Sequence, residues 1–217
     1  MKAQPRAPEK LATVMQKARA CRICRDEPAH LPALPHEPRP VFQLSARARI
    51  LLAGQAPGAR VHASGRLFTD PSGDRLRSWL GVNEEVFYNA DELAIVPMGF
   101  CFPGYDAKGS DLPPRRECKQ TWHDDLFAGR ASFDLILVIG RYARDYHLPE
   151  KKRENLTVTI QAQSENLEQT RQAPTIVLPH PSWRNTAWLK RNPWFETDLV
   201  PIIQTRIASA LENPTPA

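Results

Sequence analysis

The sequence predicts an α/β protein, a three-layer α/β/α sandwich around a central, mainly parallel four-stranded sheet. Two observations carry this prediction. Four short runs of apolar residues are nearly continuous rather than alternating, which is typical of strands that are buried on both faces. Segments with helical features separate these runs, and strands that alternate with helices favour a parallel sheet.

The four expected strands are rich in leucine and β-branched residues, which suit a buried sheet. They span residues 48–53, 93–98, 133–139 and 174–178.

Helices are expected before, between and after these strands. Ser72 is a candidate N-cap for a helix over residues 73–80, and Asn192 with Pro193 begins the last helix. Residues 151–172 are polar, and the sequence leaves them open between helix and loop. The other expected helices span residues 8–20, 114–128 and 141–147, and the last spans 194–211.

The chain divides into an arm, a domain and a tail. Residues 26–47 contain five prolines, so we expect an extended arm over the surface rather than a helix. The N-terminal helix, a Cys-x-x-Cys pair and this arm make up residues 1–47, which pack on the domain. The domain spans residues 48–211, and residues 212–217 form a tail.

Composition sets limits on function. The 29 basic and 24 acidic residues give a formal net charge of +5, which permits a polyanionic partner. No run approaches the roughly 18–20 apolar residues of a membrane span, and no secretory signal opens the chain. We therefore expect a cytoplasmic protein without a membrane partner. In that reducing compartment, the four cysteines are better read as thiols or metal ligands than as disulfides.

Each expected strand ends in an unusual segment. Residues 54–58 (GQAPG) follow the first strand, and residues 180–185 (HPSWRN) follow the fourth. Because parallel strands share one carboxyl edge, we expect a glutamine, a histidine, glycines and aromatic rings to converge there. The nucleotide-binding patterns GxGxxG and the P-loop are absent, which disfavours a nucleotide-binding enzyme.

These segments resemble motifs of the uracil-DNA glycosylase superfamily over about residues 20–205. GQAPG is similar to the loop that faces water and uracil, and residues 65–70 (GRLFTD) with 72–74 (SGD) are similar to a stretch of the iron–sulfur branches. His180-Pro181-Ser182 is similar to the third motif. The sequence LPHPSWRN, followed by WLKRNPWF, is closest to an uncharacterised bacterial branch. The resemblance implies a monofunctional glycosylase that removes uracil or another deaminated base from DNA.

The resemblance also implies site residues. His180 would contact the carbonyl oxygen of the leaving base, and Phe68 would stack on the flipped base. Gln55 would position water or read a base edge, although an amide cannot act as a general base. Asn185 is a candidate for base reading, as is Asn89, and His62 is a weaker candidate for activating water. The base-binding loop comprises Gln55, Ala56, Pro57 and Gly58.

Two positions depart from the family pattern. Ala56 stands where the strongest members carry an aspartate, and Pro97 stands where the iron–sulfur branches carry a uracil-reading asparagine. These departures favour a broader specificity that includes hypoxanthine or xanthine. They also keep open an alternative function, a non-catalytic protein that binds damaged DNA.

A basic and aromatic segment follows His180. Cations there suit DNA phosphates, and an aromatic wedge suits an unstacked base step. For Trp194 and Phe195 we prefer a core position. A single small domain on DNA is expected to act as a monomer. The candidate DNA-binding residues are Ser182, Trp183, Arg184, Lys190 and Arg191.

The four cysteines, Cys21, Cys24, Cys101 and Cys118, form a candidate metal site. Four thiolates suit either a [4Fe–4S] cluster or a structural zinc ion. The resemblance favours the cluster, in a structural role that orders the arm and a DNA-facing loop at residues 103–114. A redox protein built on the cluster is disfavoured because the sequence holds one cluster site and no flavin motif.

Overall fold

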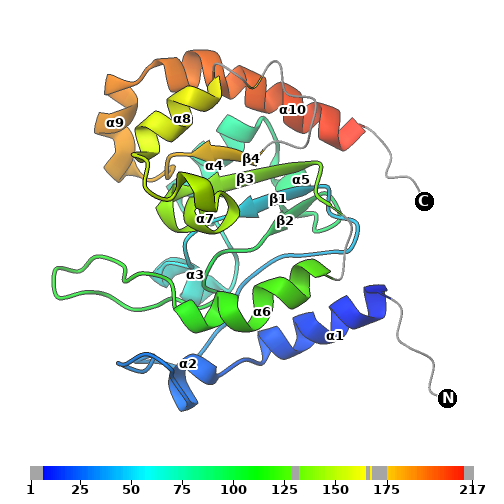
Figure 1. Cartoon of the computed structure of the whole chain (residues 1–217), viewed down its shortest axis with the longest axis vertical. Coiled ribbons are helices and arrows are strands. Elements are labelled where there is room, and N and C mark those ends of the chain that lie inside the picture. Colours follow the sequence, from blue (N-terminus) through cyan, green and yellow to red (C-terminus); the bar gives the residue numbers. More distant parts are fainter. Residues whose placement is uncertain (1–6, 129–131, 165–166, 168–174, 213–217) are drawn as a thin grey trace.

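The computed structural model describes residues 7–128, 132–164, 167 and 175–212. It has the predicted three-layer α/β/α architecture (Figure 1). The central sheet has four strands in the order β2-β1-β3-β4, and every pairing is parallel. From β1 the chain moves to one edge of the sheet to form β2, and it then crosses back over β1 to form β3. This reversal lies beside β1, where open parallel sheets place their ligands.

The strands are buried on both faces, as predicted. β1 alternates between the two layers, because Ile50 and Leu52 join one hydrophobic cluster and Leu51 joins the other. β2 alternates in the same way. The strands are β1 (Ile50–Ala53), β2 (Leu93–Ile95), β3 (Leu135–Ile139) and β4 (Thr175–Leu178).

Three strands are shorter than predicted. β2 ends at Ile95, although the N–H groups of Val96 and Met98 still bond to the carbonyl oxygens of Leu52 and Gly54, so hydrogen bonding to the loop after β1 continues past Pro97. β1 and β3 each begin two residues later than expected. The predicted start of the fourth strand, residue 174, lies outside the described residues.

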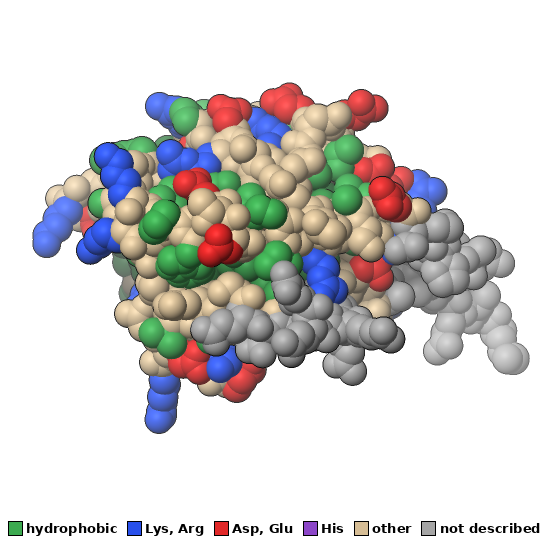
Figure 2. All heavy atoms as spheres, turned by 90° about the horizontal axis from the view of Figure 1, so that it is seen from above, with side chains coloured by type: hydrophobic (Ala, Val, Ile, Leu, Met, Phe, Trp, Pro, Cys, Tyr) green, Lys and Arg blue, Asp and Glu red, His purple; other side chains and the backbone are tan. Residues whose placement is uncertain are grey.

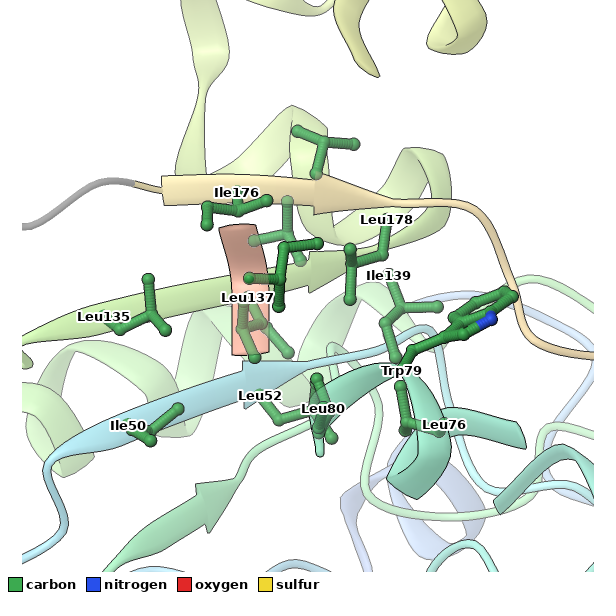
Figure 3. Packing of buried hydrophobic residues seen from close by; sticks show 14 of the residues in the cluster. Ile50, Leu52, Leu76, Trp79, Leu80, Leu135, Leu137, Ile139, Ile176 and Leu178 are labelled. Atoms are coloured by element: carbon green, nitrogen blue, oxygen red, sulfur yellow. The ribbon is translucent and has the colours of Figure 1, made fainter. Parts of the chain in front are cut away.

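One face of the sheet is covered by α4 (Pro71–Leu80), α8 (Leu156–Ser164) and α10 (Val200–Glu212). Figure 3 shows side chains of β1, β3 and β4 pointing toward Leu76, Trp79 and Leu80 of α4. The shorter α5 (Glu84–Tyr88) adds Phe87, and α7 (Gly140–His147) packs against β3 and β4.

The other face is covered by α1 (Ala7–Arg19) and α6 (Arg116–Ala128), which lie side by side below the sheet in Figure 1. Between α1 and the sheet runs the N-terminal arm, which is non-helical after α2 (Ile23–Asp26). The arm lies deeper than the surface path expected for it, since Val41, Phe42 and Leu44 are buried. Gln43 also forms an antiparallel bridge to Ile95, so this part of the arm lines the sheet edge.

The helices differ from the prediction in two informative places. Asp70, not Ser72, occupies the N-cap position of α4, because Pro71 starts the helix and the Ser72 hydroxyl donates to Asp70 at 2.6 Å. The last helix begins with a π-helical stretch, η3 (Phe195–Leu199), before α10. Pro201 lacks the N–H that would bond to residue 197, which explains the irregular start.

Several short helices were not predicted, since a single turn has little sequence signal. They are α2, α3 (Ala59–Ser64), α5, α9 (Thr186–Arg191) and the 3₁₀ turns η1 (Pro149–Lys151) and η2 (Trp183–Asn185). Within residues 151–172, the described part forms α8 and ends in a turn at Leu167. No helix in the described ranges has the length and apolar character to cross a bilayer.

Candidate active site

A cavity of about 240 Å³ opens at the carboxyl edge of the sheet. All four strands contribute to its wall. The loop after β1 supplies Gln55 to Gly58, the exit of β2 supplies Pro97, β3 supplies Ile139, and the segment after β4 supplies His180. The structure thus brings together the predicted residues Gln55, Ala56, Pro57, Gly58, Phe68 and His180.

The loop after β1 is fixed by its own backbone. The Gly54 and Gln55 carbonyl oxygens accept hydrogen bonds from the N–H groups of Met98 and Gly99, at 2.9 and 3.0 Å. The Gln55 amide Nε2 donates to the carbonyl oxygen of Leu112 at 3.4 Å. This contact leaves Oε1 of Gln55 to accept a hydrogen bond from water or from a base N–H.

Phe68 holds a backbone conformation that is rare for a bulky residue, with φ at 54°. Its carbonyl oxygen accepts hydrogen bonds from the Tyr88 hydroxyl at 3.2 Å and from Arg77 Nη1 at 3.3 Å. Its ring meets Phe87 edge to face, with the centroids 5.9 Å apart. The backbone also passes directly against Gly73, where a Cβ would lie 2.7 Å from the Phe68 carbonyl carbon. The ring that lines the cavity is therefore held by contacts to α4 and α5.

His180 is presented in one tautomer. The backbone N–H of Ser182 donates to Nδ1 at 3.1 Å, so the neutral ring carries its proton on Nε2. Burial lowers the pKa of His180 and Arg184 lowers it further, against the opposing effect of Asp70 and Asp111. The ring is neutral at pH 7 and offers an N–H donor.

Two further side chains hold the segment around His180. Arg75 of α4 donates through Nη1 to the carbonyl oxygens of Pro181 and Ser182, at 3.1 and 3.4 Å. The Asn185 amide donates to the His180 carbonyl oxygen at 2.8 Å. Asn185 does not line the cavity, so the structure does not bring this predicted base-binding residue to the base. Its contact makes it a positioning residue for His180.

Two cavity carboxylates were missed by the sequence reasoning. Asp70 lies at the start of α4, and Asp111 comes from the loop between β2 and α6. Burial raises the pKa of Asp111, while Arg184 and His180 act to lower it. The predicted DNA-facing loop at residues 103–114 contained Asp111, but no sequence spacing related it to the motifs. Tyr105 of the same loop also lines the cavity.

The remaining candidates lie elsewhere. His62 is on α3 with its ring 4.3 Å from that of His36, and it is not among the cavity residues. Asn89 caps the end of α5 and accepts the N–H of Asp91 at 3.1 Å. Pro97 lines the cavity but offers no side-chain donor or acceptor, as the sequence indicated.

The predicted DNA-binding segment forms η2 and α9 directly after His180. Trp183 is 77% exposed, and Arg184 follows it. Lys190 and Arg191 lie in the last turn of α9. Figure 2, which looks onto the α8–α10 side, shows lysine and arginine side chains at its left end, where α9 lies in Figure 1.

The core prediction for the later aromatic residues is confirmed. Phe195 is fully buried, and Trp194 is partly buried against the same core. Trp188 also packs there, and its indole N–H donates to the Thr157 hydroxyl at 2.8 Å. Among Trp183, Trp188 and Trp194, only Trp183 is exposed enough to act as a wedge.

The four cysteines line one small pocket on the opposite side of the β2 exit, together with Leu34, Phe100 and Arg115, and none is in a disulfide. The Phe100 N–H donates to the Cys118 sulfur at 3.2 Å. Burial raises the pKa of Cys101 to about 12 and that of Cys118 well above its usual value. Neighbouring cysteines raise both further, so four thiolates need a bound cation here.

The four thiols of this pocket suit a metal group, but they are not arranged around a single metal position. Within the described residues, no three histidine, cysteine or acidic side chains are arranged to hold one metal ion. A single zinc ion needs four ligands at about 2.3 Å from one centre. In an iron–sulfur cluster each thiolate binds a different iron, so the sulfurs stay farther apart. Four cysteines in one pocket are compatible with either group.

A comparison with family models gives one match, to the Uracil DNA glycosylase superfamily, over residues 41–204. That range contains the whole sheet, the cavity and the segment from His180 to α9. It excludes Cys21 and Cys24, which precede the N-terminal arm. Members of this superfamily are generally DNA glycosylases and take part in base-excision repair. With the match spanning most of the chain and every strand of the sheet, the chain belongs to the uracil-DNA glycosylase superfamily.

Proposed function

We propose that this protein removes uracil or another deaminated base from DNA by hydrolysing the N-glycosidic bond. The observation that carries the proposal is the neutral His180 ring, with its proton on Nε2, at the mouth of the aromatic-walled cavity. Pockets for drug-sized ligands have volumes of roughly 300–1,000 Å³. A cavity of about 240 Å³ suits something smaller, such as one base that has been flipped out of the duplex.

The reaction needs stabilisation of the leaving base. As the bond between C1′ and the base nitrogen breaks, the electron pair stays with the base and negative charge builds on its carbonyl oxygen. The Nε2–H of His180 donates to that oxygen, while Phe68 stacks on the ring. A single oriented donor of this kind contributes about 10²–10³-fold in rate.

Binding of DNA would use the edge formed by η2 and α9. Trp183 is exposed and follows the catalytic segment, so it suits the gap left by a flipped nucleotide. Arg184, Lys190 and Arg191 suit phosphate contacts on either side. Arg75 and Asn185 hold this edge and His180 in one arrangement.

The range of bases accepted is expected to be broad. Pro97 offers no side-chain group to read a base edge, and Ala56 supplies no carboxylate. Reading of the base therefore falls to the backbone of the loop after β1 and to Oε1 of Gln55. The same two residues favour the second candidate function, a protein that binds damaged DNA without releasing a base.

One assay separates the two functions. Protein from a host that lacks its own uracil glycosylase is incubated with labelled oligonucleotides that carry uracil, hypoxanthine, xanthine, or thymine opposite guanine. Alkali-labile sites in one or more of them, lost in His180→Ala, are expected. Binding of these oligonucleotides without any base release by the wild type would make it a damaged-DNA-binding protein.

We further propose that Cys21, Cys24, Cys101 and Cys118 hold a structural [4Fe–4S] cluster. The support is their single shared pocket and its buried thiols, together with the resemblance of the sequence to the iron–sulfur branches of the superfamily. When bound, the cluster would tie the N-terminal arm to the exit of β2. Anaerobically purified protein should be brown and contain about four irons and four sulfides per chain. A colourless protein with one zinc would assign the site to zinc.

A further inference from the structure

We propose that Asp111 is the carboxylate that activates the attacking water in this protein. The assignment rests on the proposed glycosylase function and adds the group that its active-site loop lacks. A hydrolytic glycosylase needs a proton acceptor beside C1′, and Ala56 cannot provide one. Asp70 and Asp111 are the two carboxylates among the described residues that line the cavity.

The two carboxylates differ in their hydrogen bonds. Asp70 is engaged, because its Oδ1 accepts the Ser72 hydroxyl at 2.6 Å at the start of α4. Within the described part of the chain, no donor hydrogen-bonds to the Asp111 carboxylate, and no cation pairs with it. Asp111 is therefore available for a water molecule.

The backbone around Asp111 holds it firmly. Asp111 bridges Tyr105 in a small hairpin, and the Leu112 N–H donates to the Gly104 carbonyl oxygen at 2.9 Å. At the tip, Oδ1 of Asp106 accepts the N–H groups of Lys108 and Ser110, each at 2.8 Å. An aspartate at 106 therefore shapes the hairpin, whereas the aspartate at 111 is left to face the cavity.

The hairpin is also docked on the loop after β1. Gln55 donates to the carbonyl oxygen of Leu112, the residue next to Asp111. A Cβ added at Gly58 would lie 3.6 Å from Oδ2 of Asp111, so the carboxylate stands over the last residue of GQAPG. It is also near enough to His180 for each to shift the pKa of the other. The N–H donor of His180 and the carboxylate of Asp111 thus line the same cavity.

The C1′–N bond breaks and its electron pair leaves with the base, which His180 stabilises by hydrogen bonding. The water oxygen forms a bond to C1′ and passes one proton to the Asp111 carboxylate. The carboxyl group then returns this proton to solvent, and the base anion takes up a proton. The products are the free base and an abasic sugar with a hydroxyl at C1′.

The test compares Asp111→Asn with wild type in single-turnover excision of the base that the wild type releases. Loss of a proton acceptor is expected to slow excision by about 10²–10⁴-fold. Binding to an oligonucleotide with a cleavage-resistant 2′-fluorinated nucleotide should be unchanged or tighter. Asp125→Asn is the matched control, since it removes the same charge from the exposed side of α6 and should keep the wild-type rate.

Rescue distinguishes a proton acceptor from a structural residue. In Asp111→Ala, added formate should restore the excision rate at least tenfold, because a small carboxylate can occupy the space that is left. Asp106→Ala removes the oxygen that accepts the N–H groups of Lys108 and Ser110, so it loosens the hairpin but keeps the Asp111 carboxylate, and formate should not restore its rate. Wild-type excision by Asp111→Asn would overturn the assignment and leave the glycosylase standing. An inert wild type would overturn the proposed function and this assignment together.

Discussion

Replacing Gly73 by alanine should displace Phe68 and thereby slow base excision. In α4 the added Cβ would lie 2.7 Å from the carbonyl carbon of Phe68 and 3.0 Å from its Cβ. Non-bonded carbon atoms keep about 3.5 Å, and the carbonyl oxygen of Phe68 would lie even closer to the added Cβ than these carbons, so the Phe68 backbone must retreat by more than roughly 0.8 Å. It cannot retreat freely, because Tyr88 and Arg77 hold the same carbonyl oxygen.

Two opposing contributions determine how much Gly73→Ala changes the free energy of unfolding. Alanine in a helix is favoured over glycine by about 1 kcal/mol. Overpacking costs about 1–3 kcal/mol, so we expect a net loss of up to about 2 kcal/mol in the free energy of unfolding. A displacement near 1 Å at a reacting group can cost about 10²-fold in rate, and the excision rate should fall by this order.

The assay pairs denaturant unfolding with single-turnover excision. Gly54→Ala is the stability control, since nothing lies within 4 Å of its added Cβ, and it should unfold like wild type. If Gly73→Ala is as stable and as active as wild type, then the close approach of α4 to Phe68 does not hold the stacking ring. The reasoning about this part of the site would then be wrong.

Three other results are expected. Burial lowers the pKa of His180, so an NMR titration should give a value below the ordinary 6.5, and a higher value would contradict a neutral donor at pH 7. Trp183→Ala should leave the unfolding free energy within about 0.5 kcal/mol and weaken duplex binding about tenfold, measured by titration, because the indole is exposed; equal affinity would remove it as a wedge. Cys118→Ser should abolish the visible absorption and lower Tm, whereas retained colour would exclude this buried thiol as a ligand.

The sheet could be predicted because its signal is local. A parallel strand that is buried on both faces must be apolar at consecutive positions, and Leu51 and Leu52 point to opposite layers. The edges of strands were harder to predict. The apolar run at residues 93–98 continues past Ile95, where the described strand ends, so the run itself carries no signal for that end.

Only those residues of the candidate site that lie near the ends of strands could be predicted from the sequence. Gln55, Phe68 and His180 come together because each lies in, or is held against, a segment that leaves this edge of the sheet. Asp111 could not be predicted in this way, because a hairpin far from any strand brings it to the cavity. Asn185 shows the converse: it is close to His180 in sequence, but its side chain turns to the backbone.

Two connections join the cysteine pocket to the cavity, so a metal group bound in that pocket would influence catalysis. Cys101 and Cys118 bracket the hairpin that carries Asp111, so a group bound to both would hold the two ends of this loop. Arg39 makes the second connection. Its backbone bonds to Cys101, while its guanidinium donates to the carbonyl oxygens of His62 and Ala63 at the end of α3.

Gly58, which lies beside Asp111, is the N-cap of α3, so both the hairpin and the loop after β1 depend on the arm and on the cysteine pocket. Loss of the proposed metal group should therefore reduce the excision rate more than it reduces DNA binding, since η2 and α9 follow β4, at the opposite edge of the sheet from β2. Chelation of the purified protein, followed by both measurements, tests this order of effects. An equal loss of rate and affinity would mean that the pocket supports the whole fold rather than the site.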